Sequence, residues 1–145
     1  MTTGMEVMDQ LPHRFPFLMV DRVLERVPGV RVRALKLVSH TEPFLQGHLP
    51  GRPVVPGVLL LEMLAQAGAF LEAEPLGDTP IFLAQVLEAR FRRPAFPGDA
   101  LDLEVVPEAS FGGLQRLQGT VRCGDEVLCT ARLLLKKGSP LEVAP

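Results

Sequence analysis

Residues 42–72, EPFLQGHLPGRPVVPGVLLLEMLAQAGAFLE, join a proline-rich loop to a long apolar segment. Prolines recur at every third position of the loop, at Pro50, Pro53 and Pro56. Since each proline fixes its own φ and restricts the residue before it, this loop is stiff. Apolar residues then occupy nearly every position of 58–71. The pattern predicts one long helix over 56–73 that the rest of the fold encloses.

Glu62 is the one charged residue inside this apolar segment. Its neighbours one helical turn away include no basic residue; they are Val58, Leu59, Ala65 and Gln66. Because burial without a cation raises the pKa of a carboxyl, we expect Glu62 to be partly protonated near neutrality and able to donate a proton. His48, on the stiff loop, is suited to be the matching base. Each residue also has a simpler interpretation, as a hydrogen-bonded loop histidine and a glutamate that reaches solvent or an arginine.

Gly57 and Val58 lie in the first turn of the predicted helix, where backbone amides lack intrahelical acceptors. Such amides can hold an oxygen that gains negative charge, although Gly57 could equally serve only close packing. A base, a neutral acid and an oxyanion site together match β-elimination beside a carbonyl. This chemistry requires no metal, and the three histidines have no ligand spacing that would suggest one; we expect no cofactor.

Six further segments have the composition and turn spacing of β-strands. They are residues 17–27, 30–38, 81–93, 100–106, 114–123 and 126–137. Their short connections imply an antiparallel sheet, and an all-round apolar helix must be covered on more than one side. We therefore predict an α+β fold in which a six-stranded antiparallel sheet wraps around one long helix. Residues 1–138 form a single domain in this prediction, with a short helix over 5–11 and a flexible tail over 139–145.

The bulk composition excludes several classes of protein. A net charge of -2 with 22% charged residues gives no general surface for nucleic acid. No apolar run is long enough to cross a bilayer, and no leader-like segment opens the sequence. Cys123 and Cys129 have neither metal-finger nor redox-motif spacing, which favours reduced structural thiols. We expect a cytoplasmic protein.

Three stretches together resemble a known family: LPHRFPFLMVDRVLE at 11–25, EPFLQGHLPGRPVVPGVLLLEMLAQAGAF at 42–70 and EARFRRPAFPGDAL at 88–101. In order and spacing they resemble the (3R)-hydroxyacyl-acyl carrier protein dehydratases of bacterial type II fatty-acid synthesis, over about residues 11–137. The resemblance implies the hot-dog fold and a hydro-lyase that converts (3R)-3-hydroxyacyl-acyl carrier protein to the trans-2-enoyl product. It assigns His48 as the catalytic histidine, Glu62 as the catalytic glutamate and Gly57 as the backbone donor to the thioester carbonyl.

The resemblance also implies an assembly. In this family the histidine and the glutamate of one site come from different subunits, so a homodimer is expected, and trimers of dimers are common among relatives. A glutamate rather than an aspartate at position 62 favours simple dehydration without isomerisation. Leu49 and Thr41 depart from the family's usual phenylalanine and asparagine. Because the chain has no tyrosine, an aromatic gate to an acyl tunnel would have to use phenylalanine, with Phe15, Phe17, Phe44 and Phe96 as candidates.

An acidic carrier protein that delivers a phosphopantetheine-linked substrate needs a basic landing site. The candidates are Arg52, Arg90, Arg92, Arg93, Lys136 and Lys137, although they could also form an ordinary solvated face. Two other functions fit the same fold. A hot-dog thioesterase would use an acidic residue on the helix to direct water at the thioester. A non-catalytic acyl-thioester-binding regulator would need neither catalytic group and would usually carry a nucleic-acid-binding segment.

Overall fold

The computed structural model describes residues 4–76 and 79–138. The elements in chain order are α1 (Gly4–Gln10), β1 (Arg22–Val27), β2 (Arg31–Leu37), the 3-10 turn η1 (Pro43–Leu45), α2 (Gly57–Gly68), the 3-10 turn η2 (Ala69–Leu71), β3 (Ile81–Phe91), β4 (Ala100–Phe111), β5 (Leu114–Cys123) and β6 (Glu126–Lys137). The tail predicted over 139–145 lies outside the described residues. Within them, no helix is long and apolar enough to span a membrane.

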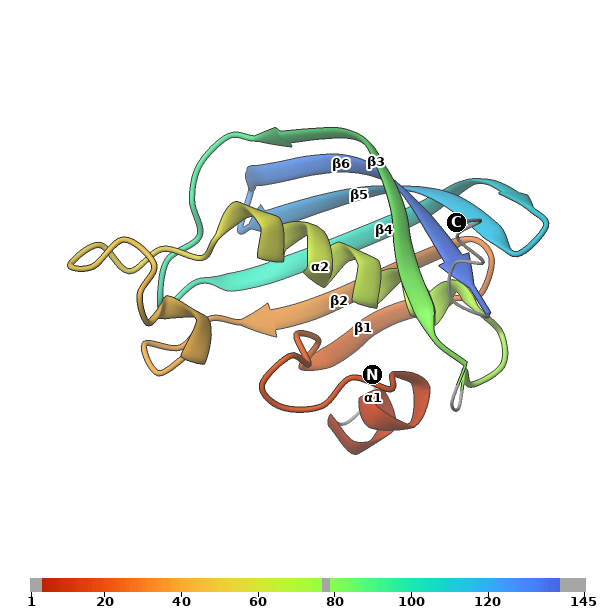
Figure 1. Ribbon diagram of the computed structural model, residues 1–145, viewed down its shortest axis with the longest axis horizontal. Helices are drawn as coiled ribbons and strands as arrows, with labels where there is room; N and C mark the ends of the chain where they lie inside the picture. Colours follow the sequence, from red (N-terminus) through yellow and green to blue (C-terminus); the bar gives the residue numbers. More distant parts are fainter. Residues whose placement is uncertain (1–3, 77–78, 139–145) are drawn as a thin grey trace, which may run out of the picture.

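The strands form one six-stranded sheet in the order β1-β2-β4-β5-β6-β3, and the neighbouring strands are antiparallel. The sheet curves around α2, and β3 passes over the helix to pair with β6 at the sheet edge (Figure 1). The predicted architecture, a six-stranded antiparallel sheet around one helix, is confirmed. The short N-terminal helix is confirmed as α1, which lies beside β1 (Figure 1).

The central helix is shorter than the predicted 56–73. Pro56 has extended ψ and is the N-cap, so α2 begins at Gly57. After the 3-10 turn η2 the backbone becomes extended at Glu72. Arg26, on β1, donates hydrogen bonds to the carbonyl oxygens of Phe70 and Glu72. These bonds supply donors to carbonyl groups that lack them at the end of the helical segment, and the chain turns away there.

The strand boundaries also differ from the prediction. Residues 17–21 form a loop before β1, because the buried side chain of Gln66 binds the backbone there: its Nε2 donates to the Phe17 carbonyl at 2.8 Å and its Oε1 accepts from the Met19 amide at 2.8 Å. At the other end of the sheet, β4 continues beyond residue 106 to Phe111. It contains Pro107 because the register shifts between Pro107 and Ala109, and a bulge tolerates a residue without an N–H.

Two glycines set how closely α2 lies on the sheet. A Cβ added at Gly119 of β5 would lie 2.8 Å from Cδ1 of the fully buried Leu64. A Cβ added at Gly68 of α2 would lie 2.7 Å from Cδ2 of Leu117 on β5. Close packing at both contacts buries the apolar face of the helix, which supplies the main driving force for this fold.

Candidate active site

Three cavities surround α2 and the loop that precedes it. The first has a volume of about 300 Å³ and is lined by His48, Val54, Val55, Gly57, Leu60, Phe91, Arg92, Arg93 and Pro94. The second, of about 40 Å³, is lined by Leu11, Pro12, His13, Glu62, Ala65, Gln66, Ala69, Leu76, Ile81 and Leu83. The third, of about 600 Å³, is a largely apolar groove lined by His40, Leu49, Arg52, Pro53, Val54, Pro94, Phe96 and Pro97. Val54 and Pro94 line both the first cavity and the groove, so the two adjoin.

The loop that carries His48 is anchored at its start by an ion pair. Lys36 Nζ, on β2, donates to Glu42 Oε1 at 2.7 Å, and the two side chains are only 7% and 14% exposed. The His48 amide donates to the Leu45 carbonyl at 3.3 Å. Leu49 has a φ of 47°, a left-handed conformation that an ordinary residue adopts only under constraint. Such constrained backbone is often found beside functional groups.

Gly57 begins α2 against the ring of Phe91. A Cβ at this position would lie 3.1 Å from Cε1 of Phe91, so the glycine does permit close packing here. The amide of Leu59 already donates to the Pro56 carbonyl at 2.9 Å. The amides of Gly57 and Val58 belong to the part of a helix that has no intrahelical acceptors. Both interpretations of Gly57 therefore remain compatible with the geometry.

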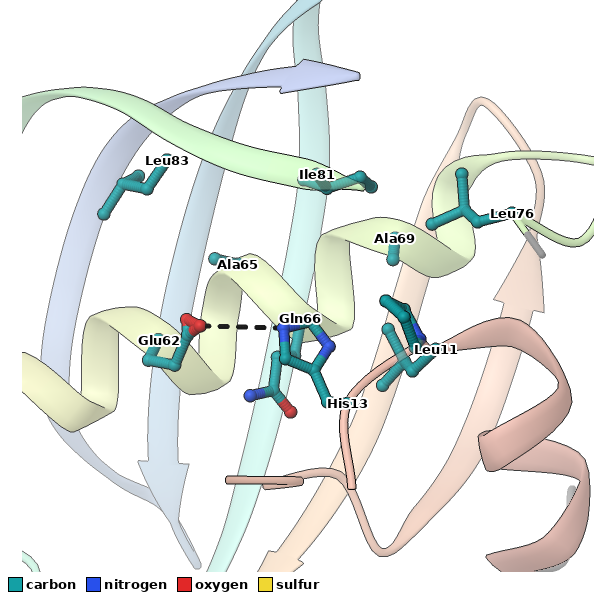
Figure 2. Close-up of a pocket in the computed structure, with 10 residues that line it drawn as sticks. Leu11, His13, Glu62, Ala65, Gln66, Ala69, Leu76, Ile81 and Leu83 are labelled. Carbon is teal, nitrogen blue, oxygen red and sulfur yellow. Dashed lines mark ion pairs between the residues drawn. The ribbon is translucent and has the colours of Figure 1, made fainter. Parts of the chain in front are cut away.

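Glu62 is half-buried in the small cavity, with its side chain 22% exposed. Burial raises the pKa of its carboxyl, and a hydrogen bond with the side chain of Gln66 opposes part of that rise. The raised pKa predicted from the sequence is confirmed in direction. Oε1 of Glu62 lies 3.9 Å from Nε2 of His13, and the two side chains point toward one another in Figure 2.

His48 and Glu62 line different cavities of the same chain. Helix geometry explains the separation. Gly57, which lines the cavity of His48, is five positions from Glu62. At roughly 100° per residue, their directions differ by about 140° around the helix. In one chain, His48 therefore lies beside Gly57, whereas Glu62 points to a different side of the helix.

The six basic residues proposed for carrier docking do not form one patch. Arg92 and Arg93 line the cavity of His48, and Arg52 lines the adjoining groove. Arg93 is engaged in ion pairs with Asp99 at 3.2 Å and Glu126 at 2.7 Å, and Arg90 pairs with Glu88 at 2.9 Å.

The two lysines lie at the opposite end of the sheet. Lys137 is paired in register with Ile81 at the start of β3, and it forms an ion pair with Glu72 at 3.2 Å. Phe91, which precedes Arg92, pairs with Cys129 at the far end of the same ladder. Since β3 has eleven residues, these ends are roughly 30 Å apart.

The candidate gate residues are distributed among several places. Phe96 lines the apolar groove and Phe44 packs against the core. Phe15 is 82% exposed, whereas Phe17 stacks on His13 with ring centroids 6.2 Å apart.

The sequence-based reasoning missed two residues of the small cavity, His13 and Gln66. The only signal for His13 was its place in the segment LPHRFPF, which contributed to the family resemblance. For Gln66 the sequence offers only its position one helical turn after Glu62. Within the described residues, the structure contains no cluster of potential metal ligands.

A curved antiparallel sheet around a single helix, with candidate groups on that helix and on the loop before it, defines an α+β protein of the hot-dog class. Residues 11–132 match the family model described as a FabA-like domain. The chain belongs to the FabA-like family.

Similar proteins agree with this assignment. The chain is 46% identical over 134 residues to the 3-hydroxyacyl-[acyl-carrier-protein] dehydratase FabZ of Polaromonas sp. (strain JS666 / ATCC BAA-500), covering 89% of this chain and 92% of the relative. It is 45% identical over 139 residues to the FabZ of Yersinia enterocolitica, covering 93% and 83%. Among solved structures, it is similar to the dehydratase heterocomplex ApeI:P from Xenorhabdus doucetiae, with a TM-score of 0.79 at 23% identity over 95% of this chain and 94% of the other. The last likeness concerns the fold.

Proposed function

We propose that this chain is a hydro-lyase that converts (3R)-3-hydroxyacyl-acyl carrier protein to the trans-2-enoyl thioester in fatty-acid synthesis. The observation that carries the proposal is the 45–46% identity, over about nine-tenths of the chain, to relatives named as FabZ dehydratases. The site chemistry supports it. A carboxyl whose pKa is raised by burial and a histidine on a constrained loop suit proton transfer in both directions.

In the proposed reaction, His48 removes the proton from the α-carbon of the thioester. The amides of Gly57 and Val58 hold the carbonyl oxygen as it gains charge. Glu62 gives its proton to the β-hydroxyl, the C–O bond breaks, and water leaves. The reaction ends with His48 protonated and Glu62 as a carboxylate, and proton exchange with solvent restores both groups.

The proposed site requires two copies of the chain, because His48 and Glu62 line different cavities of one copy. The edge strand β3 offers the surface for a second copy. Its outer edge has no strand partner within the described residues, and it carries half-exposed apolar side chains: Leu83, Val86, Leu87 and Phe91 are 40–51% exposed. An unpaired apolar edge of this length favours pairing with another strand. We therefore propose a homodimer whose seam follows β3 and α2.

The assay that tests the reaction uses a 3-hydroxyacyl thioester and follows enoyl absorbance and free thiol together. We expect enoyl formation without thiol release. Thiol release without enoyl formation would replace the dehydratase proposal with the thioesterase, and binding without either product would support the acyl-thioester-binding regulator.

We propose that the acidic carrier protein docks near Arg92 and Arg52, which border the cavity of His48 and the adjoining groove. Arg92→Glu should lower kcat/KM about tenfold for the carrier-linked substrate, since charge complementarity mainly affects association, and should spare a small thioester analogue. Lys136→Glu is the matched control, because it makes the same charge change at the far end of the sheet. Equal losses for Arg92→Glu on both substrates would contradict docking at this surface.

We propose that the protein works in the cytoplasm, where thiols stay reduced. Both cysteines are free, and Cys129 is buried in β6. Burial raises the pKa of the Cys129 thiol to about 11, so it is protonated and unreactive at neutral pH.

A further inference from the structure

His13 lies beside Glu62 without having been assigned any role. It comes from the loop between α1 and β1, and its imidazole faces the Glu62 carboxyl across the small cavity (Figure 2). Nε2 of His13 is 3.9 Å from Oε1 of Glu62. The other ring nitrogen, Nδ1, is buried and has no hydrogen-bond partner within the described residues.

The loop that carries His13 is fixed to the helix that carries Glu62. Gln66, one helical turn after Glu62, is 1% exposed and binds the backbone of the loop at Phe17 and Met19. The guanidinium of Arg14 donates to the carbonyls of Leu11 and His13, both at 2.7 Å. Hydrogen bonds to the backbone before His13, at Leu11, and after it, at Phe17 and Met19, therefore set the position of the imidazole.

The environment selects one form of the imidazole. Burial, with a contribution from the charge of Arg14, lowers the pKa of His13, so the ring is neutral at neutral pH. A buried N–H without an acceptor is rarer in proteins than an acceptor without a donor. The single ring proton thus belongs on Nε2, where it points toward Glu62, and not on the unpartnered Nδ1.

Few other groups can compete for the Glu62 carboxyl. On its own helix the polar neighbour is Gln66, whose side chain hydrogen-bonds the carboxyl as well as the loop backbone at Phe17 and Met19. The side chains that line the cavity from β3 are Ile81 and Leu83, which are apolar. Among the described lining residues, His13 is the one titratable group beside Glu62.

We propose that His13 is a positioning residue: its Nε2–H orients the Glu62 carboxyl and stabilises the carboxylate that remains when Glu62 has given up its proton. The gap of 3.9 Å closes to a hydrogen bond of about 2.9 Å by a small rotation of either side chain. The role of this contact in turnover rests on the proposed dehydration. The contact between His13 and Glu62 does not depend on that proposal.

The test is the titration of Glu62 in protein labelled with ¹³C at the glutamate carboxyl, with the Glu62 signal assigned by its loss in Glu62→Gln. A donor to the carboxylate lowers its pKa, so removing the donor raises it. In His13→Leu the Glu62 midpoint should move up by about one pH unit. His13→Gln keeps an N–H donor at nearly the same reach and should titrate close to the unmodified chain.

Turnover gives the second measurement. The alkaline limb of the kcat profile, where activity falls as Glu62 loses its proton, should move to higher pH in His13→Leu together with the carboxyl midpoint. We expect kcat to fall roughly 10- to 100-fold with little change in KM, because orientation of the acid is lost and binding is not. His13→Gln should recover most of this loss, whereas a purely structural role would lower kcat without moving the limb.

An unmoved Glu62 midpoint in folded His13→Leu would overturn the inference. If that variant fails to fold, ¹⁵N-histidine spectra of the unmodified protein decide: a proton on Nε2 supports the contact and a proton on Nδ1 refutes it. Failure of the unmodified chain to dehydrate any 3-hydroxyacyl thioester would instead refute the proposed function, while the titration and the tautomer would still decide whether His13 contacts Glu62.

Discussion

Mixing two inactive variants should restore activity if each site takes one group from each chain. His48→Ala lacks the proposed base and Glu62→Gln lacks the proposed acid, so each variant alone should have greatly reduced turnover. The two groups line different cavities of one chain. A shared site would therefore take His48 from one chain and Glu62 from the other, so the two changes can fall in different sites. In a mixed dimer one site carries both changes and the other carries neither.

The expected recovery follows from twofold symmetry. Equal amounts of two freely exchanging subunits give mixed dimers for about half of the molecules, and each has one intact site of two, so the mixture should reach about 25% of unmodified activity. Tandem purification of dimers that carry two different tags should raise this to about 50%, because the inactive pure dimers are removed.

The assay is enoyl absorbance after subunit exchange in mild denaturant and dialysis, with native mass spectrometry to count the mixed dimers. The matched control is a mixture of His48→Ala with His48→Gln, which exchanges in the same way but can form no intact site. If mixed dimers are present and activity stays at the average of the two variants, the shared site is refuted, and with it the proposed separation of His48 and Glu62 between chains.

Three further changes test the packing and electrostatics of the framework. Gly119→Ala should lower the free energy of unfolding by about 1–3 kcal/mol, because the new Cβ would overlap the fully buried Leu64; an unchanged denaturation midpoint would contradict this contact. Lys36→Met should cost about 1–3 kcal/mol, since it leaves the partly buried Glu42 carboxylate without its cation; the double variant with Glu42→Gln should recover part of the loss. Glu62→Gln should stabilise the chain more at pH 8 than at pH 5. Burial raises the pKa of Glu62 in the folded state, so the carboxylate is destabilising above that pKa, and equal gains at both pH values in chemical denaturation would argue against it.

The fold could be predicted because its local signals agree with one another. Turn residues separate alternating apolar segments, and a single all-round apolar helix leaves few architectures that can cover it. The errors fall where tertiary contacts override local pattern. Residues 17–21 have strand composition, yet Gln66, far away in the sequence, bonds the Phe17 carbonyl and the Met19 amide and holds the segment as a loop. The early end of the helical segment has a similar cause, since Arg26 binds the carbonyls of Phe70, in η2, and Glu72, just after it.

The site was predictable in its parts and less so in its arrangement. The raised pKa of Glu62 followed from the lack of a cation within one helical turn, which is local information. The separation of Glu62 from Gly57 around the helix could also be calculated from their spacing. The approach of His13 to Glu62 could not be predicted from the sequence, because it depends on a loop that is fixed only after the helix and sheet have packed.

Gln66 explains how a carboxyl on a buried helix is both tolerated and positioned. At the i+4 position from Glu62, it lies on the same face of α2, and its amide hydrogen-bonds the backbone of the His13 loop. A charged residue at position 66 would instead have paired with or repelled the carboxyl, and would have left the carbonyl of Phe17 and the amide of Met19 to find other partners. The neutral amide leaves burial as the main influence on the pKa of Glu62, opposes part of that rise through its own hydrogen bond to the carboxyl, and holds the His13 loop beside it. The same residue therefore holds the loop and hydrogen-bonds the acid, so a polar side chain that is only 1% exposed has the partners that its burial requires.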